Sequence, residues 1–172
     1  MQRADTSTAR MRRKTLITWM QHAHAMEAQS LAILLSRAAD CQETVSVRLR
    51  LEAHLGETQR HIERLQQALE RLGSTPKPFQ AGPHRLALTT NITAPFFLDP
   101  LLGTVLSDLA AEQFEVSAYT ALIAVAEHAG EAEIARLCRL NRSEDEEMAE
   151  WLDAQIPIVV AERIWRVGVM SR

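Results

Sequence analysis

The sequence is poor in the residues that interrupt helices and in those that favour strands. Its 172 residues include only six glycines, six prolines and one tyrosine, and aromatic residues make up 5%. Ala, Leu, Glu, Gln and Arg are abundant instead, and this composition predicts an all-α protein. The length suits one domain with a sizeable core, and the 47% of hydrophobic and 24% of charged residues are typical of a globular chain.

Other absences narrow the class of protein. The net charge is −3 and there is no large basic block, so the sequence predicts no nucleic-acid partner. No window is long and apolar enough to span a membrane, and no export signal is recognisable, which predicts a cytoplasmic protein. The two cysteines, Cys41 and Cys138, lack CxxC spacing, which argues against a disulfide framework and against a thiolate metal site.

Four long helical patterns are present, in two pairs. The first pair covers about residues 12–39 and 42–72, and the second covers about residues 104–129 and 131–155. Only short links join the members of each pair, which predicts two antiparallel hairpins. Residues 74–103 contain most of the prolines and are expected to form a long crossover. Two hairpins joined by one crossover are typical of a ferritin-like four-helix bundle.

The ends of the chain are expected to extend beyond the bundle within a single domain of residues 1–172. Residues 1–11 are predicted to be a flexible N-terminus. Near the other end, Pro157 interrupts the helical pattern, and residues 156–172 are predicted to form an additional C-terminal helix. Gly73 is expected to end the second helix of the bundle, as a C′ residue in the left-handed conformation.

Acidic and imidazole side chains fall on or beside the apolar stripes of the predicted helices. Residues three, four or seven positions apart share one face of a helix, and this count places the polar residues. They are Glu27 in the first helix, His54, Glu57 and His61 in the second, Glu112 and Glu115 in the third, and Glu144 and Glu147 in the fourth. The two histidines lie near the middle of the second helix's apolar face, and Glu57 lies at its edge.

This pattern predicts a metal site. A buried carboxylate is costly unless it is paired or binds a metal, and no Lys or Arg is predicted to face these acids at the same level. Counted from its turn, each helix places its acids near the middle of the bundle, with Glu27 level with Glu57. Carboxylates and imidazoles from four helices are typical of di-iron and di-manganese sites. The donor set favours iron, with manganese or zinc as alternatives.

Four segments of the sequence also resemble a known family. They are "AMEAQSLAILLSRAA", "LEAHLGETQRHIERLQQALERLGSTP", "AAEQFEVSAYTALIAVAEHAG" and "ARLCRLNRSEDEEMAEWL". Together they resemble the YciE/YciF family of bacterial ferritin-like stress-response proteins. The resemblance implies a ferritin-like bundle, often dimeric, with a rubrerythrin-type dinuclear site. By motif position it implies ligands at Glu27, His54, Glu57, Glu112, Glu115 and Glu144, and Glu147 fits the next ligand position of the wider ferritin-like pattern.

Two functions follow as hypotheses. The first is a protein that binds two iron ions per chain and serves iron or oxidative-stress handling, with oxidase-type or peroxidase-type activity left open. Its predicted metal ligands are Glu27, His54, Glu57, Glu112, Glu115, Glu144 and Glu147. His54 is expected to be a ligand or a partner of a carboxylate, whereas His24 and His61 favour the partner or core role. The alternative is a metal-free structural or stress-response interaction protein that acts as a homodimer.

Overall fold

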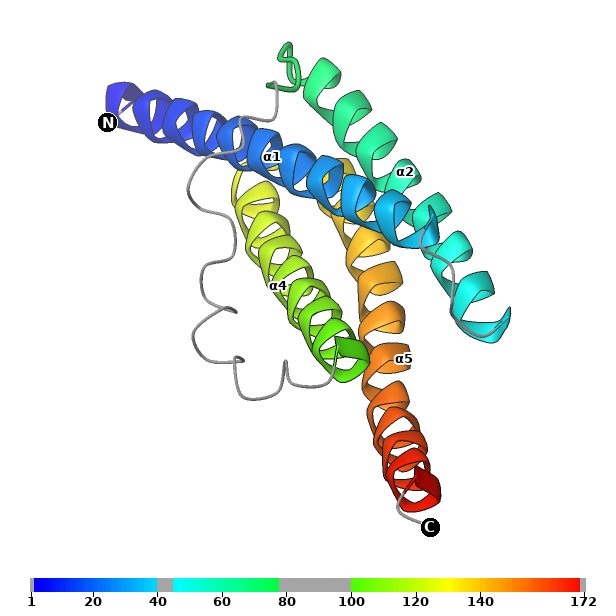
Figure 1. Ribbon diagram of the computed structural model, residues 1–172. Coiled ribbons are helices and arrows are strands. Elements are labelled where there is room, and N and C mark those ends of the chain that lie inside the picture. The colour runs from blue at the N-terminus through cyan, green and yellow to red at the C-terminus, as the bar shows by residue number, and fades with distance from the viewer. Residues whose placement is uncertain (1, 40–44, 78–99, 171–172) are drawn as a thin grey trace. The chain divides into compact units, whose positions relative to one another are not determined.

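A computed structural model describes residues 2–39, 45–77 and 100–170, and four α-helices occupy most of these ranges (Figure 1). The helices are α1 (Gln2–Ala39), α2 (Val45–Arg71), α4 (Pro100–His128) and α5 (Ala132–Met170). The three described ranges contain no strand. The prediction of an all-α fold is therefore confirmed. The predicted crossover lies largely outside the described residues, as does Cys41.

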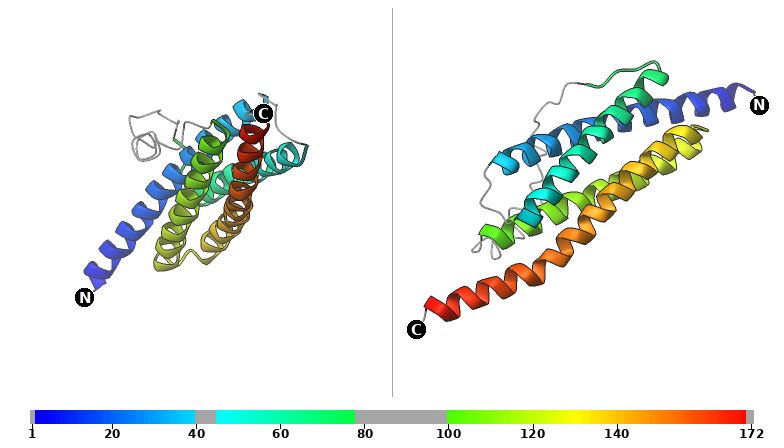
Figure 2. Two further views of the ribbon diagram at one scale, coloured as in Figure 1. Left: turned by 60° about the horizontal axis from the view of Figure 1, so that its bottom comes forward. Right: turned by 90° about the vertical axis from the view of Figure 1, so that its right-hand side faces the viewer.

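The chain divides into two compact units. The first consists of residues 1–80 and 117–144, and the second consists of residues 81–116 and 145–172. The first unit therefore holds all of α1 and α2, together with the C-terminal part of α4 and the N-terminal part of α5. Within it, α1 and α2 pack along each other as an antiparallel pair (Figure 2).

The first unit has a continuous hydrophobic core to which all four helices contribute. Its central buried residues are Leu16, Met20 and Ala23 of α1, Leu65, Ala68, Leu69 and Leu72 around the end of α2, Tyr119, Leu122, Ile123 and Ala126 of α4, and Ile134, Ala135 and Cys138 of α5. The intervals of three and four residues place each set on one helix face. Burial of these faces is the main source of the stability of such helices.

Glycine ends two of the helices, and at Gly73 this confirms the prediction from the sequence. Gly73 follows α2 with a φ of 67°, and Gly130 follows α4 with a φ of 76°. This left-handed conformation turns the chain so that the amide of Ser74 donates to the carbonyl of Leu69 at 2.9 Å. The equivalent bond after α4 allows α5 to start after a very short link.

The predicted start of the first helix is wrong. α1 begins at Gln2, so that residues 2–11 are helical and do not form an irregular N-terminus. Two arginines next to this segment contact the ends of other helices in the first unit. Arg13 donates to the carbonyl of Leu72 at 2.9 Å, and Arg12 donates to the carbonyl of His128 at 3.4 Å. These bonds satisfy carbonyls that have no partner within their own helices.

The predicted separate C-terminal helix is also wrong, although its residues are helical as expected. α5 continues through Pro157 to Met170. Proline removes one backbone hydrogen bond, to the carbonyl four residues earlier. Both Pro157 and Asp153 are exposed, so water reaches this turn of the helix and offsets the lost bond. None of the described helices has an apolar stretch long enough to cross a membrane.

Candidate metal centre

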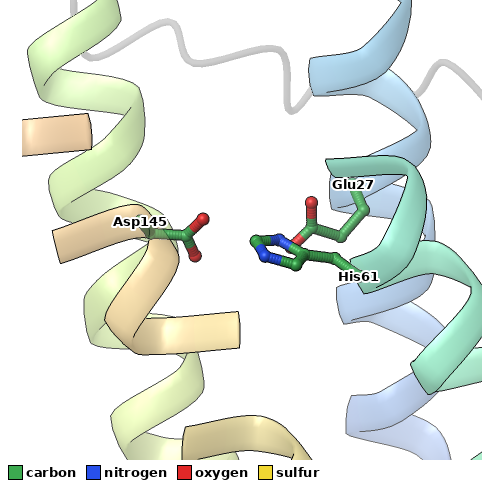
Figure 3. A group of neighbouring side chains, drawn as sticks. All are labelled: Glu27, His61 and Asp145. Carbon is green, nitrogen blue, oxygen red and sulfur yellow. The ribbon is translucent and has the colours of Figure 1, made fainter. Parts of the chain in front are cut away.

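Two fully buried side chains, one carboxylate and one imidazole, contact each other in the first unit. Glu27 of α1 and His61 of α2 face each other, and His61 Nδ1 lies 3.3 Å from Glu27 Oε1 (Figure 3). Met20 and Leu34 are buried on the same face of α1, which confirms the predicted position of Glu27 within an apolar stripe. The third side chain in Figure 3, Asp145, belongs to the second unit and is described with it.

Tyr119 and Asn141 complete the surroundings of Glu27 in this unit. The Tyr119 hydroxyl donates to Glu27 Oε1 at 2.5 Å and accepts a hydrogen bond from Asn141 Nδ2 at 2.8 Å. The rings of Tyr119 and His61 meet edge to face, with their centroids 6.1 Å apart. Among the described residues, none donates a hydrogen bond to the other carboxylate oxygen, Glu27 Oε2, which is buried. A buried acceptor without a donor is costly, and a cation would remove that cost.

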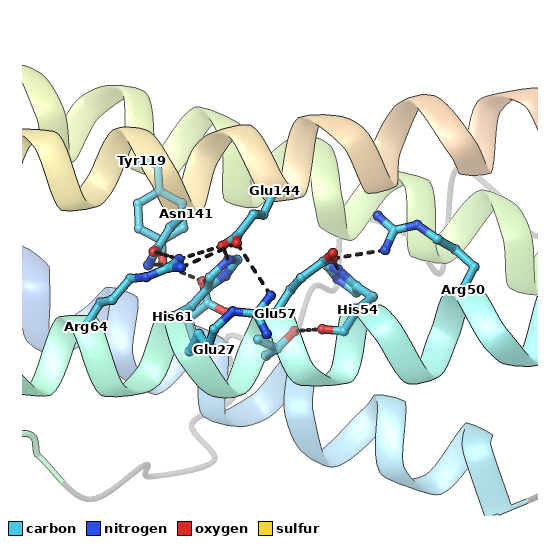
Figure 4. Close-up of polar contacts among 11 residues, drawn as sticks. Glu27, Arg50, His54, Glu57, His61, Arg64, Tyr119, Asn141 and Glu144 are labelled. Atoms are coloured by element: carbon cyan, nitrogen blue, oxygen red, sulfur yellow. Dashed lines mark hydrogen bonds and ion pairs between the residues drawn. The ribbon is translucent and has the colours of Figure 1, made fainter.

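The second ring nitrogen of His61 contacts another carboxylate. His61 Nε2 lies 2.8 Å from Oε2 of Glu144, which also accepts from Arg64 Nη1 at 2.5 Å (Figure 4). Arg60 adds a longer ion pair of 3.5 Å to the same carboxylate. Burial raises the pKa of Glu144, but the hydrogen bonds and charges of Arg64 and His61 outweigh burial and hold the pKa below its ordinary value.

The predicted absence of nearby arginines is therefore wrong. Arg60 and Arg64 reach Glu144 from α2, and Arg50 reaches Glu57 within α2. A helical count places only the Cα atom, whereas an arginine side chain is long enough to run along the helix surface to a group outside its own stripe. Two of the predicted ligands, Glu57 and Glu144, thus already have positively charged partners.

A second group on α2 joins His54, Glu57 and Arg50. Glu57 Oε2 accepts from His54 Nδ1 at 2.9 Å and from Arg50 Nη1 at 3.0 Å. The hydrogen bond from His54 lowers the pKa of Glu57 to about 2, with help from Arg50 and against the effect of burial. Because Glu57 is then an anion that only accepts, His54 donates through Nδ1 and presents Nε2 to other partners.

The histidines of α2 lie on its buried face, as the helical count predicts. His54 and His61 are 1% and 0% exposed. Glu27 contacts His61, one helical turn beyond Glu57, so the predicted level of Glu27 on α2 is off by one turn. His24 is only half-buried; burial lowers its pKa, and the charge of Glu27 opposes this shift.

The described part of the second unit contains three further buried acids. Glu112 and Glu115 of α4 are 6% and 3% exposed, which confirms their predicted place on the buried face of that helix. On α5, Asp145 is fully buried, but Glu147 is exposed. The expectation that Glu147 lies on the buried face is therefore wrong, and the sequence reasoning missed Asp145.

The wrong prediction of the buried face of α5 has a clear cause. The large apolar residues that share a helix face with Glu144 and Glu147 include Leu140 and Ile158, which are 42% and 51% exposed. The face that is buried carries smaller and polar residues at intervals of three and four, namely Ile134, Cys138, Asn141, Asp145, Met148 and Leu152. This alternative face was visible in the sequence, but the large aliphatic residues on the outer face gave the stronger signal.

Buried groups of the kind that could hold a metal ion are thus present in both units. They are Glu27, His54 and His61 in the first unit, and Glu112 and Asp145 in the second. Carboxylate oxygens and imidazole nitrogens are ligands that suit iron, manganese and zinc. Helices that carry such groups on their buried faces are typical of ferritin-like folds.

The comparisons with known proteins identify the family. Residues 11–164 match the family described as DUF892, a domain of unknown function, and the chain belongs to this family. A protein from Xanthomonas campestris pv. campestris is 26% identical, with a TM-score of 0.78 over 92% of this chain and 99% of its own. YcfI from Rhodopseudomonas palustris is 27% identical, with a TM-score of 0.66 over 81% of this chain and 90% of its own.

A more distant structure supports the fold class. Bacterioferritin from Desulfovibrio desulfuricans, which has a diiron site, is 16% identical to this chain. The alignment covers 89% of this chain and 84% of the bacterioferritin chain, with a TM-score of 0.72. At this level of identity the similarity shows the fold, which is the predicted ferritin-like one.

Proposed function

We propose that the protein binds metal ions, most favourably two iron ions per chain, through buried carboxylates and imidazoles of its helices. The observation that carries the proposal is the pair formed by His54 and Glu57. A metal-binding histidine usually donates its second N–H to a carboxylate, which fixes the ring and makes the other nitrogen a better ligand. His54 has this arrangement, since Nδ1 donates to Glu57 and Nε2 is directed to other partners.

Glu27 supports the proposal from a second helix. It is fully buried, its Oε1 accepts from Tyr119, and none of the described side chains donates to its Oε2. Salt bridges with arginines neutralise both oxygens of Glu144 and one oxygen of Glu57. Among the described residues, no such salt bridge reaches Glu27 Oε2. A divalent cation at Oε2 would stabilise the carboxylate at a position where hydration is excluded.

The proposed ligand set differs in part from the one that the sequence predicts. In the first unit it keeps Glu27, His54 and Glu144, assigns Glu57 the role of orienting His54, and adds the buried His61. In the second unit it keeps Glu112 and Glu115 and adds the buried Asp145. It omits Glu147, which is exposed. Bound iron would supply electron-transfer chemistry toward O2 or peroxide, and the chain would supply the fixed carboxylates and imidazoles that hold it.

The proposed cellular role of the protein rests on its resemblance to other proteins. The bacterioferritin of similar fold has a diiron site, and the sequence segments resemble the YciE/YciF stress-response proteins. We therefore propose a role in iron or oxidative-stress handling, in a cytoplasmic homodimer.

Metal content after reconstitution tests the proposal. Protein purified without added metal is incubated with Fe(II) under anaerobic conditions, desalted and analysed for iron, with circular dichroism to confirm the fold. We expect about two ions per chain and their loss in Glu27→Gln/His54→Gln. The matched control is His22→Gln/Glu63→Gln, which changes the same residue types at exposed positions of α1 and α2. A wild-type protein without iron, or equal retention by both double variants, would refute the proposal.

A second candidate is the metal-independent structural or interaction protein. The arginine contacts of Glu57 and Glu144 favour it, because they neutralise two acids without a cation. Exposed Ile164 and Trp165 on α5, 68% and 70% exposed, add an apolar surface that a partner chain could cover. In this case a chelator leaves the thermal midpoint unchanged and reconstitution yields no bound iron.

A further inference from the structure

Four polar side chains, one from each helix, form a single hydrogen-bonded chain in the first unit. Arg64 of α2 donates to Oδ1 of Asn141 on α5 at 2.9 Å. Asn141 Nδ2 donates to the hydroxyl of Tyr119 on α4 at 2.8 Å, and Tyr119 donates to Oε1 of Glu27 on α1 at 2.5 Å (Figure 4). Glu27, Tyr119 and Asn141 are at most 1% exposed, so bulk water does not compete for these bonds.

The direction of every bond in this chain follows from its first member. A guanidinium group has donors but no acceptor, so Asn141 must turn its carbonyl oxygen toward Arg64 and its NH2 group toward Tyr119. The Tyr119 oxygen then accepts from Asn141, and its one hydrogen is left for Glu27. The guanidinium of Arg64 thereby ensures, through Asn141 and Tyr119, that Glu27 Oε1 receives a hydrogen bond.

We propose that Arg64, Asn141 and Tyr119 are positioning residues that hold Glu27 in the orientation required of a metal ligand. They occupy Oε1 with a hydrogen bond and leave Oε2 directed to the ion. This inference rests on the proposed metal-binding function and extends it. Partners of this kind fix the rotamer of a ligand before the metal arrives, so that less freedom is lost on binding.

Two substitutions separate positioning from simple packing. Tyr119→Phe removes the donor to Glu27 and keeps the ring. Asn141→Asp keeps the size of the side chain and its bond from Arg64, but it replaces the NH2 donor with an acceptor that competes with Glu27 for the Tyr119 hydrogen. Ser143→Ala, at an exposed position of α5, is the matched control.

The first measurement is the affinity for Zn(II), used as a redox-inert probe in competition with a chromophoric chelator. We expect Tyr119→Phe and Asn141→Asp each to bind Zn(II) about 10- to 100-fold more weakly than the wild type, and Ser143→Ala to bind as the wild type does. Circular dichroism reports whether each variant is folded. If Tyr119→Phe does not fold, the near-isosteric Asn141→Asp decides the question.

The second measurement uses Tyr119 itself, which is the only tyrosine of the sequence. Tyrosine labelled with ¹³C at Cζ gives one resonance, and we expect it to shift in metal-free Asn141→Asp because the bonding of the hydroxyl changes. An unchanged resonance would overturn the inference. So would wild-type Zn(II) affinity in folded Tyr119→Phe or Asn141→Asp, in which case the proposed function stands. A wild-type protein that binds no Zn(II) and no Fe(II) would overturn both.

Discussion

Acidification should remove a measurable part of the protein's stability through one residue, Glu57. Its carboxylate accepts hydrogen bonds from His54 and Arg50, and its pKa in the folded protein is about 2, against an ordinary value of 4.5. When the pKa of a carboxyl group is lower in the folded protein than in the unfolded chain, the group stabilises the folded protein at pH values above its unfolded pKa. The contribution is lost as pH falls from about 4.5 to about 2.

The magnitude follows from the shift. Two and a half pKa units correspond to about 3 kcal/mol. The side chains of Glu57 and Arg50 are 16% and 17% exposed, so solvent screens part of the interaction. We therefore expect about 2 kcal/mol at neutral pH, with at least half of it gone by pH 3.

Urea unfolding of wild type and Glu57→Gln between pH 7 and pH 3, followed by far-ultraviolet circular dichroism, measures this contribution. The free-energy difference between the two proteins should be about 2 kcal/mol at pH 7 and should shrink as pH falls. Glu63→Gln, at an exposed position of the same helix, should lie within about 0.5 kcal/mol of the wild type at every pH. A difference for Glu57→Gln that stays constant or grows in acid would refute the reasoning.

Three further results are expected from other parts of the molecule. Leu69→Ala, at a fully buried position, should lower the free energy of unfolding by about 2–5 kcal/mol in urea titrations. Burial raises the pKa of the Cys138 thiol to about 12, so in Cys41→Ser protein this thiol should react with a disulfide reagent at pH 8 only after unfolding. Pro157→Ala should restore a backbone bond to the carbonyl of Asp153 and slow amide hydrogen exchange in that turn of α5.

The helix with the clearest one-sided hydrophobic periodicity is α2. On α1 and α4 the apolar residues are less one-sided, because Trp19 and Phe114 are exposed, but Glu27, Glu112 and Glu115 are buried as predicted. On α5 the apolar residues are spread over two faces. Leu140 and Ile158 are exposed, and the buried face holds Asn141 and Asp145. Hydrophobicity alone favours the wrong face when the buried face carries polar residues such as Asn141, whose hydrogen-bond partners Arg64 and Tyr119 lie on other helices.

The site was predictable as a group of residues but not as a set of contacts. Helical counting brings Glu27, His54 and His61 to the interior, but it does not follow long side chains, and so it missed the arginines on Glu57 and Glu144. Nor does it fix the offset between two helices, which decides that Glu27 meets His61. Both depend on tertiary packing, which a periodicity in one helix does not contain.

Among the three predicted acidic ligands of the first unit, the surroundings of Glu27 favour a bound metal most. Glu57 and Glu144 each contact an arginine, so their charges are balanced within the first unit. Among the described residues, no arginine contacts Glu27, whose neighbours are the Tyr119 hydroxyl and the His61 ring. No described arginine balances its charge, and a bound cation would do so. Metal ligands must be deprotonated to bind, so metal affinity in such a site falls in acid. For this reason a substitution of Glu27 distinguishes a metal centre from a network of salt bridges better than a substitution of Glu57 or Glu144 does.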